Sequence, residues 1–221
     1  MKKFLWISLL VMAVWAKSNC YETAQKLYNL QNSIVEKSFI ALSKGAWAIY
    51  NQEIKVVSLG KKIQNNQTLY GIEVVINKKP AQIWYKMVEK SFKVAKNSIS
   101  FKTLDPYEIY LSMGNGQMMH ITKAQIDFFM RMQGKKWSTI LTLGQINIPL
   151  QCKNIPKLKT FVYDINNKKS VKAVKITKVQ TGAYIIVSNE VPFGLIKSSS
   201  LHMTDYGFAG EKVTVKASIK K

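Results

Sequence analysis

Few side chains in this sequence could carry out acid–base or metal chemistry. The histidines are His120 and His202, which lie in separate strand-like stretches, and neither has a cysteine or an acid at metal-ligand spacing. The acidic residues are scattered, and no two form a recognisable catalytic pair, although paired carboxylates need only be close in space. We therefore expect both histidines to be structural, with a functional role as the less common alternative. The acids considered are Glu73, Asp105, Glu108 and Asp127.

Two short motifs that can mark a reactive site favour ordinary turns here. Ser198–Ser200 lacks the flanking glycines of a serine-hydrolase nucleophile and is typical of a solvated turn. Gly114–Gly116 lacks the following helix and lysine of a phosphate-binding loop, and Gly-Asn-Gly is a strong hairpin signal. The sequence therefore predicts a protein that is not an enzyme and that carries no cofactor and no metal.

Large aromatic and methionine side chains offer a different chemistry, the binding of an apolar ligand. They lie on the predicted elements or at their ends, and flexible methionine side chains adapt to irregular shapes. A set of them is a candidate lining for a cavity that holds an acyl chain, while the filling of an ordinary core, the more common use of such residues, is the competing interpretation. The candidate ligand-binding residues are Trp47, Tyr70, Trp84, Met118, Phe129, Trp137 and Phe193.

Lysine dominates the charged residues. The formal net charge is +21, and Arg131 is the only arginine among 33 basic residues. Arginine supplies the planar fork that recognises bases and phosphates, whereas lysine is a hydrated point charge. The composition therefore favours diffuse attraction to anions, such as an anionic membrane surface, and argues against specific nucleic-acid recognition. Nonspecific binding of exported nucleic acid stays open, as does a lysine excess that reflects only genome composition and solubility.

The first residues, Met1–Ala16, have the pattern of a secretory signal peptide. Lys2 and Lys3 form the positive end, an apolar run of about 12 residues follows, and Ala16 ends a cleavage site. We expect cleavage after Ala16 and a periplasmic mature protein. Because a membrane anchor needs about 20 apolar residues, an uncleaved anchor is the less common alternative. A lipoprotein modified at Cys20 would need small residues just before it, where a lysine and an asparagine stand.

The sequence contains two cysteines, Cys20 and Cys152. In an exported protein two cysteines can form one disulfide, which would tie the N-terminal helix to the middle of the chain. Two independent thiols are the alternative, because a sequence does not show whether the two α-carbons come close.

Residues 18–43 have the apolar spacing of an amphipathic helix, with Leu27, Leu30 and Ile34 on one face. We expect this helix to pack on a sheet, and binding to a membrane surface is the alternative use of such a face. Gly45 follows as a natural terminator.

From Ala46 onward the apolar period changes to two, which is typical of antiparallel strands with one buried face. In Val171–Val179 the alternation slips between Ala173 and Val174, which predicts a bulge. Pro192 and Gly194 are expected to kink the stretch Gly182–Ser200, so that a sheet that contains it could curve strongly there. The expected strands are Ala46–Val57, Thr68–Ile76, Ala81–Val88, Tyr107–Met113, Gln117–Ile121, Thr139–Leu143, Gln145–Leu150, Leu158–Asp164, Val171–Val179, Ala183–Ser188 and Glu211–Lys220.

A second helix is expected over Thr122–Gln133, where Thr122 and Gln125 have the spacing of a capping box. The chain is thus divided into a signal peptide over residues 1–16, an N-terminal helix over 17–45 and a single antiparallel β half-barrel domain over 46–221. We expect a mainly β fold with two helices, in which a strongly curved antiparallel sheet or incomplete β-barrel is covered by helices.

Short segments along the chain carry a resemblance to a known fold. The segments are Gly45–Tyr50, Leu69–Val74, Ile83–Lys86, Ile148–Cys152, Val191–Lys197 and Asp205–Gly207. In their order they resemble exported bacterial domains of unknown function that look like periplasmic lipoprotein-carrier (LolA-like) half-barrels. The resemblance implies an unclosed β-barrel whose concave apolar face can hold an acyl chain, and it implies no catalytic residues.

These observations predict a non-catalytic periplasmic protein that binds a hydrophobic, anionic ligand in an apolar concave face. The expected partners are a lipid or an acylated protein and an anionic membrane surface. The alternative is a structural or accessory subunit of an envelope protein complex, which would use an exposed sheet edge and its lysines to contact a protein partner.

Overall fold

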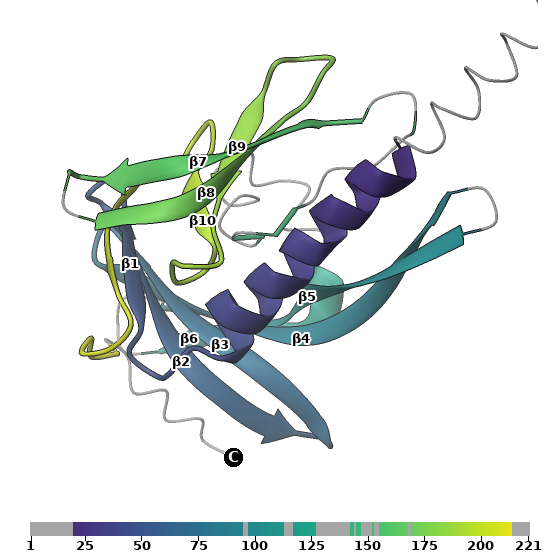
Figure 1. Ribbon diagram of the computed structural model, residues 1–221. Coiled ribbons are helices and arrows are strands. Elements are labelled where there is room, and N and C mark those ends of the chain that lie inside the picture. The colour runs from purple at the N-terminus through teal and green to yellow at the C-terminus, as the bar shows by residue number, and fades with distance from the viewer. Residues whose placement is uncertain are drawn as a thin grey trace, which may run out of the picture.

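The computed structural model describes residues 20–94, 97–112, 117–126, 142–143, 145–146, 152, 155–167 and 169–213. The predicted signal peptide, Met1–Ala16, and two of the candidate ligand-binding residues, Phe129 and Trp137, lie outside these ranges. The described part is mainly β: eleven strands form two antiparallel sheets, of seven and four strands, and a long helix runs between them in the view of Figure 1.

The helix begins at Cys20 and runs through residue 35, then continues as one π-helical segment, η1 (Glu36–Ile40). This π-helical segment ends at Ala41, whose N–H donates to the carbonyl oxygen of Glu36 at 2.9 Å. Gly45 follows with φ +88°, a conformation that glycine adopts without strain. The helix predicted over residues 18–43 is therefore present.

The seven-stranded sheet is a meander in which the last of the described strands returns to pair with the first. Its order is β11-β1-β2-β3-β4-β5-β6, and every neighbouring pair is antiparallel. The strands are β1 (Trp47–Tyr50), β2 (Ile54–Gln64), β3 (Gln67–Ile76), β4 (Lys79–Val94), β5 (Asn97–Ser112), β6 (Met118–Ile121) and β11 (Met203–Gly207).

Tight turns with positive φ connect the first strands of this sheet. Asn51 and Gln52 have φ +52° and +60°, so the stretch Ala46–Val57, predicted as one strand, is in fact the hairpin β1–β2. Asparagine tolerates this backbone region, and it fills the first turn position again at Asn65 and Asn77. The second of those turns comes before Lys79, and Pro80 lies within β4, where it is paired with Val75 of β3.

The four-stranded sheet has the order β10-β9-β8-β7. It contains β7 (Lys157–Ile165), β8 (Lys169–Thr177), β9 (Tyr184–Val187) and β10 (Leu195–Lys197). The kinked stretch Gly182–Ser200 is the β9–β10 pair: the chain reverses through Phe193 and Gly194, with φ +62° and +69°, and Leu195 pairs with Val187. The kink is therefore a chain reversal and not a bend within one curling strand.

The bulge predicted in Val171–Val179 is absent from β8, whose pairing with β7 runs without a break. The alternation slips for another reason. Val171 and Ala173 are buried on one face of the strand, whereas Ile176, also buried, points to the opposite face. One face of β8 is therefore buried near the start of the strand, and the opposite face is buried near its end.

Further predictions fall at least partly outside the described residues. Residues 211–213, at the start of the strand predicted over Glu211–Lys220, are not in a strand, and the rest of that stretch is not described. Residues 142–143 and 145–146, from two more predicted strands, are not in strands either. Residues 123–126 of the second helix are helical, and the N–H of Thr122 donates to Oε1 of Gln125 at 2.9 Å, one half of the predicted capping box.

One buried cluster joins the helix to both sheets. It contains Leu27, Ile34 and Phe39 from the helix, strand residues such as Ile83 from the larger sheet, and Ala173 from the smaller one. The mainly antiparallel β class is confirmed, but the described strands form two sheets and no closed barrel, where one bent layer was predicted. Among the described residues, no helix is both long enough and apolar enough to span a bilayer.

Candidate functional site

A groove of about 680 Å³ lies between the first half of the helix and the edge strand β7 of the smaller sheet with its neighbour β8. Its helix wall consists of Thr23, Lys26 and Leu30. These residues are spaced by three and four positions, so they form one stripe along the helix. The buried residues Leu27 and Ile34 belong to the core cluster, so the same helix serves both the core and the groove.

The opposite wall is built at the start of β7 and from its neighbour β8. Leu158 and Thr160 are two residues apart and point to the same face, and Thr160 is paired with Val174 of β8. Pro156, which is buried, and Lys157 complete this wall at the point where β7 begins. Leu158 and Val174 also contact the core cluster from the outside, so the floor of the groove is the outer surface of the core.

The lining combines an apolar surface with positive charge. Leu30, Leu158 and Val174 are partly buried, whereas Lys26 and Lys157 are exposed, one on each wall. No carboxylate is among the lining residues in the described part of the chain. The volume lies in the range of small-molecule sites, which are mostly apolar with a few polar groups that orient the ligand. The groove therefore suits a ligand with an apolar body and a negative group.

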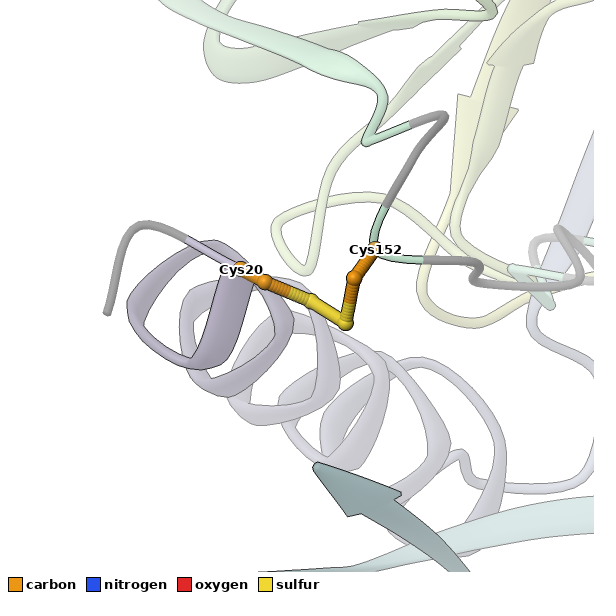
Figure 2. Close-up of a disulfide and its surroundings, with 2 residues drawn as sticks. All are labelled: Cys20 and Cys152. Carbon is orange, nitrogen blue, oxygen red and sulfur yellow. A yellow bond between two sulfur atoms is a disulfide. The ribbon is translucent and has the colours of Figure 1, made fainter. Parts of the chain in front are cut away.

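A disulfide joins Cys20, three residues before Thr23 of the helix wall, to Cys152 (Figure 2). The two α-carbons are 5.3 Å apart and 132 residues separate the cysteines in sequence. The bond that was predicted as one of two alternatives is thus present, and it joins the first residue of the described helix to the chain that leads into β7.

The aromatic residues predicted to bind a ligand do not gather in the groove. Phe193 is fully buried, and its ring meets that of Phe39 edge-on at 5.8 Å between centroids, so it fills the core. Tyr70, on β3, packs against the core cluster from outside, and Met118, on β6, is half-buried. None of the five candidates that the structure describes is a lining residue; Phe129 and Trp137 are not described.

Two of the candidate tryptophans, Trp47 and Trp84, each lie over a glycine of a neighbouring strand. A Cβ atom on Gly207 would come within 2.5 Å of Nε1 of Trp47, and one on Gly71 within 2.7 Å of Cζ3 of Trp84. Each indole therefore covers a strip of backbone that only glycine leaves open. The ammonium group of Lys62 lies over the Trp84 ring, at 4.4 Å from the ring centroid, in a cation–π contact.

The carboxylate of Glu108 lies in the same region and is fully engaged. Lys62 Nζ donates to its Oε2 at 2.9 Å and Gln64 Nε2 to its Oε1 at 2.5 Å, and Tyr110 Oη donates to it as well. Burial raises the pKa of Glu108, but these donors outweigh burial and bring the pKa below its ordinary value. The carboxylate of Glu108 is therefore held by one ion pair and two further hydrogen bonds.

The two histidines take part in separate local contacts. The ring of His120 stacks on Tyr110 at 4.7 Å, and Nε2 of His202 lies 3.1 Å from Oη of Tyr163. Burial, followed by the nearby charge of Lys197, lowers the pKa of His202, which favours the neutral ring. Among the described residues no group of three potential ligands could hold a metal ion. Each ring is thus in contact with one tyrosine side chain.

Sequence reasoning missed the strand wall of the groove. Leu30 was recognised as a helix residue and Leu158 as a strand residue, but nothing placed them opposite each other. The signal that could have done so is the cysteine pair, because a bond from Cys20 to Cys152 brings the start of the helix to the start of β7.

No protein-family model, curated protein or solved structure matches this chain. Function is therefore inferred from the groove, its charges and its covalent anchor.

Proposed function

We propose that this protein is a non-catalytic periplasmic binding protein for a hydrophobic anion, such as a lipid or the acyl chain of a lipoprotein, and that the ligand occupies the groove between the helix and β7–β8. The observation that carries the proposal is the composition of the groove, in which an apolar floor lies between lysines on opposite walls. An anionic head group would sit between Lys26 and Lys157, and the chain would run over Leu30, Leu158 and Val174.

The energies involved are sufficient for binding. Burial of an acyl chain contributes about 0.8 kcal/mol per methylene group, so about eight methylenes would supply about 6 kcal/mol before the costs of association. A well-placed lysine adds about 1 kcal/mol towards an anionic group at a surface. Chain burial therefore sets the affinity, and the lysines select for an anion over a neutral lipid.

The proposal moves the ligand from the position that the half-barrel resemblance implies. In that picture the acyl chain occupies the concave face of the sheet. Here the helix residue Phe39 and the turn residue Phe193 contribute to a closed apolar cluster with the sheet, and the groove lies on the outer surface of that cluster. We still propose that the seven-stranded sheet is related to the incomplete barrel of the carriers. The proposed ligand site, however, lies beside the four-stranded sheet.

The test is a charge reversal on both walls, Lys26→Glu with Lys157→Glu, in the mature protein. We expect the affinity for cis-parinarate, a fluorescent fatty-acid anion, to fall by at least about 30-fold, since two attractions of about 1 kcal/mol each are lost and repulsion replaces them. The matched control is Lys61→Glu with Lys90→Glu, which makes the same change in net charge at exposed positions of β2 and β4 and should change the affinity less than about twofold. Unmodified protein that binds no fatty acid at low salt would refute the proposal.

A second candidate function is that of an accessory subunit of an envelope complex. The supporting observation is that β7 is an edge strand of its sheet, and its Val162 side chain is 64% exposed. An extended segment of a partner could add to such an edge by main-chain hydrogen bonds. Against this, Lys157 and Lys159 lie on the same strand, and lysines on edge strands commonly prevent pairing. Crosslinking in the envelope that recovers one stoichiometric protein through β7, with no lipid, would favour this candidate.

A further inference from the structure

The helix wall of the groove begins at a cysteine. Cys20 precedes Thr23 by three residues, and Lys26 and Leu30 follow at the same helical spacing, so the cysteine lies at the N-terminal end of the stripe that lines the groove. The Cys20 residue is only 2% exposed, which means that the disulfide holds this end of the helix against the protein and not in solvent.

The strand wall begins at the other cysteine. Cys152 lies four residues before Pro156, the first lining residue on this side, and β7 starts immediately afterwards at Lys157. In contrast to Cys20, the Cys152 residue is exposed. One covalent bond therefore joins the starting points of both walls, with its more accessible partner on the strand side (Figure 2).

The helix also makes core contacts away from this bond. One turn beyond Lys26 and Leu27, Oε1 of Gln31 accepts a hydrogen bond from the buried N–H of Ile146 at 2.6 Å. Further along, Oγ of Ser33 accepts one from Nδ2 of Asn189 at 2.6 Å. These contacts and the core cluster hold the helix from its middle onward, and Ala24 and Tyr28 pack against Ile99 and Phe101 of β5 nearer to Cys20. Loss of the disulfide would therefore act mainly on the strand wall, whose start near Pro156 is joined to the helix by this bond.

We propose that the Cys20–Cys152 disulfide is a redox gate on the groove, an inference that rests on the ligand-binding function proposed above. While the bond is intact, the two walls are fixed at the spacing that binds the ligand. A dithiol reductant or a dithiol oxidoreductase of the envelope opens the bond, the two walls lose their shared anchor, and the ligand is released.

The chemistry is ordinary thiol–disulfide exchange. A thiolate of the reductant attacks the sulfur of Cys152, a mixed disulfide forms there, and Cys20 leaves as a thiolate that takes up a proton. The second thiol of the reductant then attacks the mixed disulfide, so the reductant becomes a disulfide and Cys152 is released as a thiol. Two electrons and two protons pass from the dithiol to the cysteine pair.

A gate of this kind has a reciprocal signature that a purely structural disulfide lacks. If the oxidised protein binds the ligand more tightly than the reduced protein by some factor, the ligand must make the disulfide harder to reduce by the same factor. If the disulfide merely stabilises the fold and both redox forms are folded, their affinities are equal and the ligand leaves the redox equilibrium unchanged.

The experiment uses the mature protein, cis-parinarate as the probe and near-ultraviolet circular dichroism to verify that the reduced protein is folded. The dissociation constant is measured for the oxidised protein, for protein reduced with dithiothreitol, and for the variant Cys20→Ser with Cys152→Ser. Separately, the thiol–disulfide equilibrium in glutathione buffers is measured by alkylation and mass spectrometry, with and without the probe. We expect about tenfold weaker binding to both disulfide-free forms, and a shift of the glutathione equilibrium by the same factor.

The outcomes separate the gate from the function on which it rests. Equal affinity of the folded oxidised and reduced proteins overturns the gate and leaves the binding function intact. Loss of the near-ultraviolet signal on reduction also overturns it, because affinity would then follow folding alone. Oxidised protein that does not bind cis-parinarate removes the proposed function, and the gate with it.

Discussion

Two apolar regions of this molecule differ in what fills them. Between the helix and the seven-stranded sheet, the rings of Phe39, Tyr85 and Phe193 meet edge-on at centroid distances of 6.4 and 5.8 Å, and all three residues are buried. Beside β7, by contrast, the outer surface of the same core borders an open groove. In this protein, aromatic residues therefore fill the core, whereas smaller aliphatic residues flanked by lysines line the groove.

The helix itself shows the contrast along its circumference. One side contributes Leu27 and Ile34 to the core, and a second side stacks Tyr28 on Phe101 of β5 at 4.1 Å between ring centroids. The side that carries Leu30 faces the groove. A helix held on two sides provides a rigid wall for the third, which is what a preorganised binding site requires.

The largest effect on stability is expected from a comparison of two truncations, one in the core and one in the groove. Phe193→Ala removes a fully buried ring and leaves a non-glycine residue at φ +62°, so we expect a loss of about 3–5 kcal/mol in the free energy of unfolding. Leu30→Ala, at a partly buried position, should cost about 1 kcal/mol.

Ligand affinity should respond in the opposite order. Urea unfolding gives the stabilities, and a cis-parinarate titration of the folded fraction gives the affinities. Leu30→Ala should weaken binding by about fivefold, through about 1 kcal/mol of lost apolar contact, and Phe193→Ala should leave binding nearly unchanged. If Phe193→Ala instead created or enlarged a fatty-acid site, the interior and not the groove would be the place where ligands bind.

Local features of the fold could be predicted from the sequence, and long-range ones could not. The helix, the asparagine turn at Asn65 and the hairpin that ends in Met118–Ile121 depend on spacing and turn chemistry within a few residues. The turn at Gln52 was missed because glutamine rarely adopts positive φ. The return of β11 to pair with β1 leaves no local signal, since its partner lies about 150 residues earlier in the chain.

The candidate site was harder to predict than the fold for the same reason. Aromatic residues were chosen because of their size, yet Trp47 and Trp84 cover glycines and Phe193 fills the core. The groove combines a helix near residue 26 with a strand near residue 158, and neither segment is unusual alone. The long-range information in the sequence was the cysteine pair, which says that two segments meet but not what lies between them.

A smaller effect is expected from two buried tyrosines that differ in one hydrogen bond. Tyr50 and Tyr85 are both buried, and burial raises the pKa of each hydroxyl well above its ordinary value. Oη of Tyr50 donates to the carbonyl oxygen of Leu195 at 3.0 Å, whereas Oη of Tyr85 has no hydrogen-bond partner within the part of the chain that is described.

Replacement by phenylalanine should therefore have opposite signs at these two positions. Tyr50→Phe orphans the carbonyl group of Leu195 and should destabilise the protein by about 1–2 kcal/mol, whereas Tyr85→Phe removes an unsatisfied buried hydroxyl and should stabilise it by about 1 kcal/mol. Chemical denaturation of the two single variants beside the parent protein measures both changes. Destabilisation by Tyr85→Phe would mean that the interior is wet enough to hydrate that hydroxyl, and the contrast between a solid core and a hollow groove would weaken.

The smallest effect concerns the junction between the two sheets, where Tyr163 of β7 meets His202 beside β11. Burial, and then the charge of Lys197, lower the pKa of His202 in the folded protein. The unfolded chain thus binds a proton there more readily than the folded one, so the stability that depends on the neutral ring is present above pH 6.5 and is lost as the pH falls below it. A neutral Nε2 can also accept the hydrogen bond from Tyr163, and the imidazolium cannot.

We expect the free energy of unfolding to decrease slightly from pH 7.5 to pH 5.5, and His202→Gln to remove that part of the slope. Because this junction lies at the opposite end of β7 from Lys157, the same pH change should alter cis-parinarate affinity equally in the parent and the variant; a difference between them would show that the groove extends along the whole strand.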